Sequence, residues 1–311
     1  MKIATREAYG AALAEIGSDN NIIVLDADLS KSTKTDVFKK KYPDRFINMG
    51  IAEANMMAVA AGIASCGKTV FASTFAMFAS GRAFEQVRNS ICYPQLNVKI
   101  GATHAGITVG EDGASHQCIE DLATMRVIPN MTVVCPADGV ETRQAIIAAA
   151  KTEGPFYIRL ARLATPVLFD ESTYKFELGK GVTVREGSDV TIIATGMMVA
   201  EAVEAVEVLK QEGISARLIN IHTIKPIDKD IIVKAAKETG AIVTCEEHNV
   251  IGGLGSAVAE VLVENCPVPV KMVGVKDKFG KSGKPDELLK MYGLTSKDIV
   301  SNVKDVLKLK K

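Results

Sequence analysis

Residues 21–25 read NIIVL, and this stretch is the clearest indication of the fold of the first half of the chain. It is short and apolar and lies between polar residues, which is typical of a strand buried on both faces of a parallel sheet. The stretch DVTIIA at residues 189–194 has the same character in the second half. Strand and helix patterns alternate outward from both stretches. The sequence therefore predicts an α/β protein of two consecutive three-layer α/β/α domains with mainly parallel sheets.

The first predicted domain spans residues 1–168, and the second spans residues 188–311. In the first domain we expect further strands at 45–48, 69–72, 98–103, 132–135 and 156–160 and helices at 50–65, 82–91 and 139–151. In the second domain we expect further strands at 215–221, 241–245 and 268–273 and helices at 199–211, 228–238 and 254–264. Residues 169–187, which are less regular and contain several glycines, are predicted to be a linker.

Composition and charge narrow the class of protein. The chain has 311 residues, which is too long for one ordinary core and fits two domains. Lys plus Arg and Asp plus Glu each total 37, so the chain lacks the basic field that nucleic-acid or anionic-membrane binding requires. The N-terminal MKIATREAYG has no apolar signal core, and the six cysteines show neither CxxC nor zinc spacing. We therefore expect a cytoplasmic protein with free thiols and no nucleic-acid or membrane partner.

Polar and aromatic side chains follow the predicted strands of the first domain where those strands end. They form five groups: Asp26, Asp28, Ser30 and Ser32; Asn48 to Glu53; Ser73 to Phe78; Thr103 to His116; and Arg159 with Arg162. Because ligands sit at the carboxyl ends of strands in open parallel sheets, we expect these groups to form one site. His104 and His116 have no obvious third metal ligand, although Glu111 or Asp112 could supply one. We therefore expect proton transfer or substrate hydrogen bonding here, and no metal bound by this chain.

Four segments, in this order, resemble the transketolase family. They are NMGIAEANM (48–56), STFAMFASGRAFEQVRN (73–89), THAGITVGEDGASHQCIEDLA (103–123) and PADGVE (136–141). The resemblance covers essentially the whole chain and matches the pyrimidine-binding domain and the C-terminal domain of that family. The run VGEDGASHQ after TH is the specific part, because GIAE alone is shared more widely among thiamine-diphosphate enzymes. The chain is therefore expected to be the C-terminal subunit of a split transketolase.

The resemblance implies a pocket for the aminopyrimidine ring of thiamine diphosphate, the cofactor that supplies a carbanion. Glu53 matches the glutamate that bonds a ring nitrogen and keeps the ring in its reactive tautomer. The apolar neighbours of Glu53 predict that its carboxyl group is buried. Phe75 and Phe78 match the aromatic pocket, with Phe75 the better candidate for direct stacking. Asp28 matches a residue that faces the thiazolium side of the cofactor.

The resemblance also implies a site for the phosphate group of the substrate. Arg6, Ser32, His104 and Arg162 match the family's phosphate-binding positions. Cations and hydroxyl groups are the side chains that bind phosphate oxygens. The segment IRLAR places Arg159 and Arg162 near the same strand end, so the sequence leaves open which of the two arginines binds phosphate.

The remaining implied roles concern the reacting part of the sugar. Asp112 matches the residue that bonds a substrate hydroxyl, and His116 matches a histidine that faces the reacting carbons. Hydrogen bonding or proton transfer on the sugar oxygens is the expected work of His116. The resemblance thus implies Glu53, His104 and His116 as catalytic residues.

The motif that holds Mg²⁺ and the cofactor's diphosphate in this family is not found in the chain. That motif is GDG followed by Asn roughly 25–30 residues later, which supplies oxygen ligands for a hard cation. EDG at 111–113 and ADG at 137–139 lack a suitable Asn. The resemblance therefore implies a separate N-terminal subunit that ligates Mg²⁺, and an α₂β₂ heterotetramer. The small residues of the predicted helix at 50–65 suggest that it packs between subunits. The implied reaction is transfer of a two-carbon ketol unit between sugar phosphates, as in the pentose phosphate pathway.

Other interpretations stay open from the sequence. 1-Deoxyxylulose-5-phosphate synthases have a similar domain but usually carry Asp-Arg where this chain has Thr103–His104. The β subunits of 2-oxo-acid dehydrogenases have a similar size but lack GEDGxxHQ. A non-catalytic scaffold with a decayed site is a further alternative, although Glu53 and His104 are present. In the second domain, the loop HNVIGGLGS that begins at His248 is expected to cap a helix and to have no catalytic role.

Overall fold

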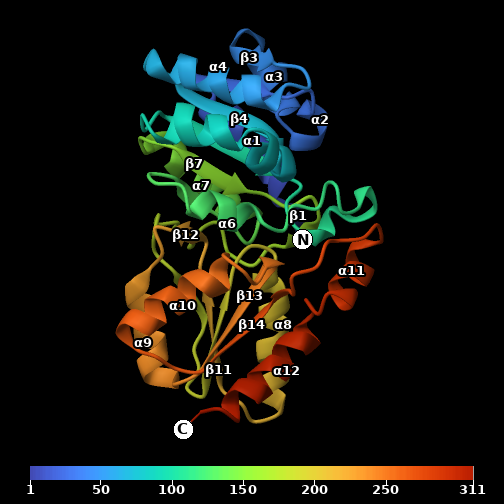
Figure 1. The fold of residues 1–311 in the computed structure, drawn as a ribbon, viewed down its shortest axis with the longest axis vertical. Helices are drawn as coiled ribbons and strands as arrows, with labels where there is room; N and C mark the ends of the chain where they lie inside the picture. Colours follow the sequence, from blue (N-terminus) through green and yellow to red (C-terminus); the bar gives the residue numbers. More distant parts are fainter. Residues whose placement is uncertain (311) are drawn as a thin grey trace.

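A computed structural model of the protein describes residues 1–310, which form two stacked α/β domains (Figure 1). The first domain contains a seven-stranded sheet, and the second contains a five-stranded sheet. Strands within each sheet are mainly parallel, and helices cover both faces. The predicted fold class is therefore confirmed. No helix within residues 1–310 combines the length and the apolar character that crossing a membrane requires.

The strands of the first domain bring several distant segments to one edge. Side by side lie β3 (Phe46–Asn48), β2 (Ile22–Asp26), β4 (Thr69–Phe75), β5 (Val98–Thr103), β7 (Phe156–Arg159) and β6 (Thr132–Val134). These strands pair in parallel, with Asp26 beside Ser73 and Phe75 beside Thr103. Their carboxyl ends therefore meet, and the polar groups expected from the sequence follow those ends.

Helices on the two faces of this sheet close two apolar cores. One face is covered by α1 (Thr5–Ile16), α3 (Asp36–Lys41) and α7 (Gly139–Lys151). The other is covered by α4 (Glu53–Ser65), α6 (Asp121–Arg126) and the segment from Phe78 to Cys92. Burial of apolar side chains on both faces explains why the strands read as continuous apolar runs.

The segment from 78 to 92 differs from the α-helix expected over 82–91. Two π-helical stretches, Phe78–Arg82 and Val87–Cys92, flank the short α5 (Phe84–Gln86). A π turn takes in one more residue than an α turn and occurs frequently at functional sites. The residues from Phe78 to Arg82 consequently face directions that a regular helical period does not predict.

The second sheet runs in the order β14 (Val270–Val275), β13 (Ile242–Asn249), β10 (Val190–Ala194), β11 (Ala216–Asn220) and β9 (Val182–Arg185). Helices α8 (Met198–Gln211) and α12 (Ser296–Leu307) cover one face, and α9 (Lys229–Thr239) and α10 (Leu254–Asn265) cover the other. Strand β9 lies within the range predicted as a linker and pairs antiparallel with β11. Part of that range therefore completes the edge of the second sheet.

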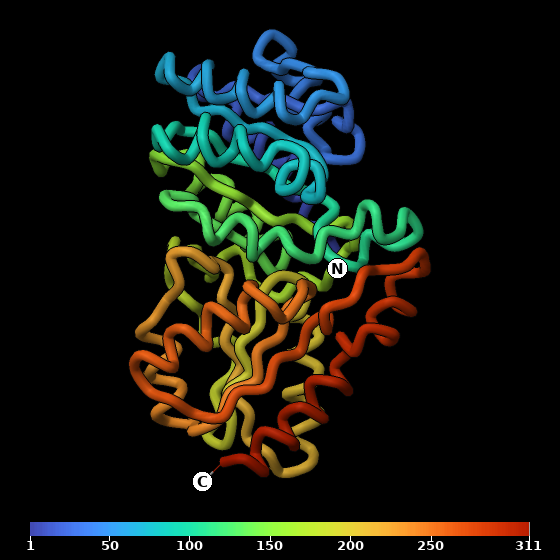
Figure 2. Tube along the Cα trace, viewed as in Figure 1, coloured from blue at the N-terminus to red at the C-terminus, as the bar shows by residue number. Residues whose placement is uncertain are grey.

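One short strand also joins the two domains. β12 (Thr223–Lys225) comes from the second half of the chain but pairs antiparallel with β6 at the edge of the first sheet. Within the first domain, β1 (Lys2–Ala4) pairs antiparallel with β8 (Ala164–Pro166) in a separate two-stranded sheet. Figure 2 shows the red segment that precedes α11 (Pro285–Met291) rising to meet the green segment around the 3₁₀ turns at Ile107–Asp112. The second domain therefore touches the first close to the expected site.

Candidate active site

The loop after β2 is organised by a buried carboxylate, Asp26. Its oxygens accept hydrogen bonds from Leu29 N (2.6 Å), Thr33 Oγ1 (2.7 Å) and Thr35 Oγ1 (2.9 Å). Burial raises the pKa of Asp26, and these donors oppose that shift. Asp28 lies on the same loop with φ of 64° and is exposed, and its carboxylate accepts from Asn48 Nδ2 at 2.9 Å. Asp26 therefore fixes the loop that carries Asp28 and Ser32.

Glu53 is the first residue of α4, and its side chain is 4% exposed. Its Oε1 accepts a hydrogen bond from Arg82 Nη1 at 3.0 Å. The Arg82 guanidinium lies 4.1 Å from the Phe78 ring centroid, a cation–π contact. Sequence patterns do not single out Arg82, because they do not predict the π-helical turn that directs its side chain toward Glu53. The expected burial of Glu53 is observed, and one arginine links this carboxylate to the aromatic residues.

Aromatic rings gather beside this ion pair. The rings of Phe75 and Phe78 stack with centroids 5.8 Å apart. His104 stacks on Phe75 at 3.9 Å, and His116 meets the Phe78 ring edge-on at 5.5 Å. The carboxyl ends of β4 and β5 thus present flat rings, against which a planar heterocycle can pack.

His104 follows β5 with φ of 57° and is buried. Arg6 Nη1 lies 3.3 Å from its Nε2, and Thr103 Oγ1 lies 3.0 Å from its Nδ1. Since Arg6 can only donate, we assign the ring proton to Nδ1, which then donates to Thr103. Burial, together with the charges of Arg6 and Arg162 and nearby His116, lowers the pKa of His104 to about 3. The ring is therefore neutral at physiological pH.

Arg6 and Arg162 make a cationic corner next to His104. Arg6 Nη1 donates to the Ser32 carbonyl oxygen at 3.0 Å, and its buried Nε has no partner among residues 1–310. Burial lowers the pKa of Arg6. Arg162 Nη1 donates to the Val109 carbonyl oxygen and lies 3.3 Å from Glu111 Oε2. Two guanidinium groups beside a neutral imidazole suit a phosphate or a similar anion.

Arg159 occupies a different environment from Arg162. Its side chain is 6% exposed and pairs with fully buried Asp121, with Nε 2.9 Å from Oδ2. Its Nη2 donates to the Glu247 carbonyl oxygen at 2.9 Å. These contacts occupy the hydrogen-bond donors of the guanidinium within the protein interior. Of the two arginines, Arg162 is the one that reaches the cationic corner.

Asp112 and Asp28 lie at the margin of this arrangement, whereas His116 contacts the Phe78 ring. His116 is half-buried, and its Nδ1 lies 3.0 Å from Ser115 Oγ. Asp112 is exposed at the end of the 3₁₀ turns, and within the described part of the chain its carboxylate has no hydrogen-bond partner. Asp28 contacts Asn48 rather than the aromatic cluster. Within residues 1–310, no three His, Cys, Asp or Glu side chains are placed to hold a metal ion.

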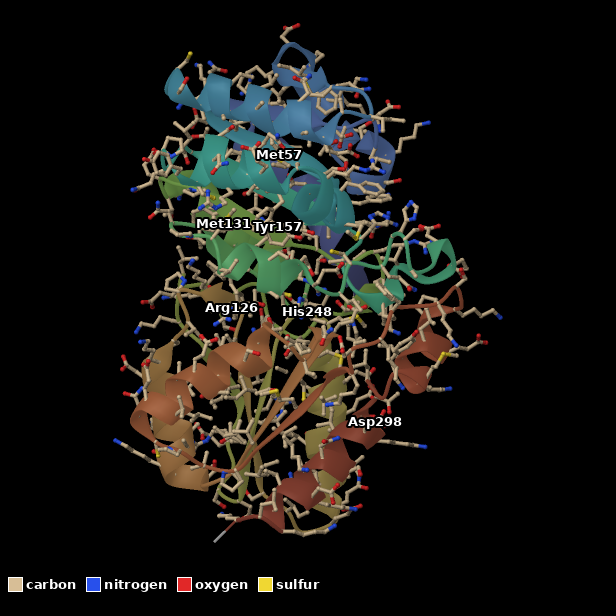
Figure 3. All side chains as sticks on the ribbon, viewed as in Figure 1. Met57, Arg126, Met131, Tyr157, His248 and Asp298 are labelled. Atoms are coloured by element: carbon tan, nitrogen blue, oxygen red, sulfur yellow. The ribbon has the colours of Figure 1, made fainter. Side chains whose placement is uncertain are left out.

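The loop from His248 to Ser256 contacts α6, where Ala123 N lies 3.4 Å from His248 Nε2. His248 is buried at the junction of the domains, where Figure 3 labels it close to Arg126. Its Nδ1 donates to the Asn249 carbonyl oxygen at 2.6 Å. The first amides of α10, Leu254 N and Gly255 N, donate to Glu246 at 2.7 and 2.8 Å. Glu246 therefore caps the N-terminus of α10 by accepting hydrogen bonds from its first amides.

Comparison with known families accounts for this arrangement. Residues 1–167 match the family described as "Transketolase, pyrimidine binding domain", and residues 179–299 match "Transketolase, C-terminal domain". The chain therefore belongs to the transketolase family, as the sequence motifs predicted. Within that family, it corresponds to the C-terminal part of a split transketolase.

Individual similar proteins support the assignment to a split transketolase. A solved structure described as "Split gene transketolase, inactive beta4 tetramer" is 59% identical, with a TM-score of 0.93 over 99% of this chain and 100% of that one. The "6-deoxy-6-sulfo-D-fructose transketolase subunit SqwH" of Clostridium sp. (strain MSTE9) is 46% identical over 98% of this chain and 95% of its own length. The transketolase of Homo sapiens is 41% identical, but the match spans 98% of this chain and 49% of the human protein.

Proposed function

We propose that this chain is the C-terminal subunit of a thiamine-diphosphate-dependent transketolase. It transfers a two-carbon ketol unit from a ketose phosphate to an aldose phosphate, and it acts only with a separate N-terminal subunit. The observation that carries the proposal is buried Glu53, joined through Arg82 to the stacked pair Phe75 and Phe78. A buried carboxyl group next to flat apolar faces fits an aminopyrimidine ring, which needs both.

In this proposal the chain supplies one half of the cofactor site. Thiamine diphosphate, when bound, supplies the carbanion for ketol transfer. Glu53 holds or shares a proton with the ring nitrogen of the aminopyrimidine, while Phe75 and Phe78 orient the ring and exclude water. Asp28 faces the thiazolium side. The N-terminal subunit ligates Mg²⁺ and holds the diphosphate through its GDG and Asn residues.

The substrate lies next to the cofactor in this proposal. Arg6 and Arg162 bind the phosphate group, and Ser32 orients Arg6 through its carbonyl oxygen. Neutral His104 accepts from Arg6 at Nε2 and so helps to hold that guanidinium in place. His116 exchanges a proton with a sugar oxygen, and Asp112 bonds a sugar hydroxyl. The neutral state of His104 leaves the two arginines as the counter-charges for the anion.

The proposed assembly is a cytoplasmic α₂β₂ heterotetramer in the pentose phosphate pathway. The outer face of α4 carries small residues, including exposed Ala58 and Gly62, against which a second backbone can pack closely. A Cβ added at Gly62 would meet no atom within 4 Å in the single chain. The 59% identical split-gene transketolase is described as an inactive beta4 tetramer, which supports self-association of this chain and its inactivity as a homo-oligomer.

Sulfonated ketoses are a second candidate substrate class. The SqwH subunit, 46% identical to this chain, is named for a 6-deoxy-6-sulfofructose transketolase. Guanidinium groups bind sulfonate oxygens as they bind phosphate oxygens, so the cationic corner suits either anion. We favour the phosphate because a doubly charged anion gains more from two guanidinium groups.

Reconstitution tests the proposed function. The chain is mixed with an N-terminal subunit that carries GDG and Asn, in the presence of thiamine diphosphate and Mg²⁺. Ketol transfer from fructose 6-phosphate or 6-deoxy-6-sulfofructose to an aldose phosphate is then followed by chromatography. We expect transfer from the phosphate ester in the mixture and none with either chain alone. Substantial turnover by this chain alone refutes the two-chain proposal, and preference for the sulfonate moves the substrate to the second class.

A further inference from the structure

The segment from Thr103 to Gln117, called the site loop here, carries His104 near one end and Asp112 and His116 near the other. Its glycines at 106, 110 and 113 have φ between 75° and 87°. Such a backbone has no regular secondary structure to hold it beyond the short 3₁₀ turns at Ile107–Asp112. The loop therefore needs support from neighbouring elements to keep its side chains in place.

The first support comes from Glu247 on β13 of the second domain. Glu247 is 2% exposed, and its Oε1 accepts a hydrogen bond from Thr108 N at 2.6 Å. At Gly106 an added Cβ would lie 2.3 Å from the Glu247 carboxyl carbon, so this carboxylate lies directly against the loop backbone. Arg159 holds the main chain of Glu247 from the first domain at 2.9 Å. This bond holds the part of β13 from which the carboxylate extends to the loop.

The second support joins the site loop to residues 276–284, called the strap here. Gln117 is 3% exposed, and the two hydrogens of its Nε2 are shared among the carbonyl oxygens of Ile107 (3.0 Å), Gly110 (3.2 Å) and Lys281 (2.9 Å). At Gly280 an added Cβ would lie 1.8 Å from Gln117 Oε1. One buried amide thus ties two points of the loop to the strap, which Figure 2 shows lying against the loop.

We propose that the C-terminal domain acts in ketol transfer by positioning the site loop, with Glu247 and Gln117 as the positioning residues. The inference rests on the proposed function for its substrate, and it gives the C-terminal domain a defined role. The loop carries substrate-side residues, whereas Glu53 and Phe75 lie on other elements. The loop histidines also contact the rings of Phe75 and Phe78, but those two residues are held by β4 and the π turn that follows it. Loosening the loop is therefore expected to weaken substrate use far more than cofactor binding.

The test compares Glu247→Ala and Gln117→Ala with Glu246→Ala in the complete two-chain complex. Glu246 is a matched control because it is buried on the same strand but bonds α10 instead of the loop. We expect the first two variants to raise KM for fructose 6-phosphate about 10- to 100-fold. The Kd for thiamine diphosphate, measured by calorimetry, stays within about twofold. Glu247→Gln restores most of the loss because its amide oxygen still accepts from Thr108 N.

A second readout separates this inference from the proposed function. Amide hydrogen exchange across residues 105–112 is expected to accelerate at least about tenfold in Glu247→Ala and Gln117→Ala but not in Glu246→Ala. Unchanged exchange in both variants overturns the positioning role, as does an equal rise in KM for the Glu246 control. The two proposals can also fail separately. If exchange is faster in both variants but the wild-type complex transfers no ketol units, the positioning of the loop is supported and the proposed function is refuted. Gln117→Ala keeps the test valid if Glu247→Ala fails to fold.

Discussion

Replacing Asp121 with alanine leaves the Arg159 guanidinium buried without its counter-charge. Asp121 is fully buried and accepts from Arg159 Nε at 2.9 Å and from Tyr157 Oη at 2.9 Å. Removing one partner of a buried ion pair costs about 3–5 kcal/mol. The lost tyrosine bond adds about 1 kcal/mol. We expect Asp121→Ala to lower the free energy of unfolding by roughly 4–6 kcal/mol, a large part of a typical domain's stability of about 5–15 kcal/mol.

Thermal unfolding of the isolated chain measures this loss. About 2–4 °C per kcal/mol is typical of a domain of this size, so the expected fall in Tm is roughly 8–24 °C. Glu260→Ala is the matched control, since Glu260 pairs with Arg126 but its side chain is 63% exposed. That pair is worth less than about 1 kcal/mol. Equal small shifts for both variants refute the structural role assigned to Arg159 and return it as a candidate for phosphate binding.

Three further predictions concern single residues. Arg162→Ala should raise KM for a phosphorylated ketose about 10- to 100-fold and leave an unphosphorylated ketose nearly unchanged, whereas an equal effect on both discards its phosphate role. Glu141 is buried on α7, and burial raises its pKa to about 7. The folded state therefore binds the proton more tightly than the unfolded state. The resulting stabilisation is complete below the unfolded pKa and disappears as pH rises through 7. Between pH 4.5 and pH 8, the free energy of unfolding of the wild type should fall by about 3 kcal/mol more than that of Glu141→Gln. An equal change in the two proteins contradicts this. His104 should stay neutral from pH 5 to 8, and a titrating ring signal in NMR spectra in that range disagrees with its lowered pKa.

Much of the arrangement could be predicted from the sequence for a simple reason. Buried parallel strands read as short apolar runs, and their carboxyl ends share one edge. Glu53, Phe75 and His104 follow different strands or open the next helix, so the sheet brings them to one edge despite their separation in sequence. The motifs around these residues then indicated the family.

Other features depend on contacts that local patterns do not encode. Arg82 reaches Glu53 through a π turn, which shifts its direction relative to a regular helix. Glu247 contacts Thr108 across 139 residues of sequence, and nothing near either residue signals the pairing. The three-residue strand β12 is too short to show a period of two and belongs to the sheet of the other domain. These contacts follow from how the domains pack.

Arg159 and Arg162 illustrate the same limit at the site itself. Both follow one apolar strand, and their residue type is identical. Their difference arises from Asp121, which lies on α6 and neutralises Arg159 in the interior. Only the packing of α6 against β7 separates the structural arginine from the one that faces the cationic corner.

In the proposed function, Glu53 activates the cofactor that is held between two chains. Deuterium exchange at the thiazolium C2 carbon of thiamine diphosphate, bound at saturation to the two-chain complex, measures that activation without any sugar. We expect Glu53→Gln to slow this exchange by at least about 100-fold while the cofactor stays bound. Exchange at the wild-type rate in the saturated variant would contradict the role of Glu53.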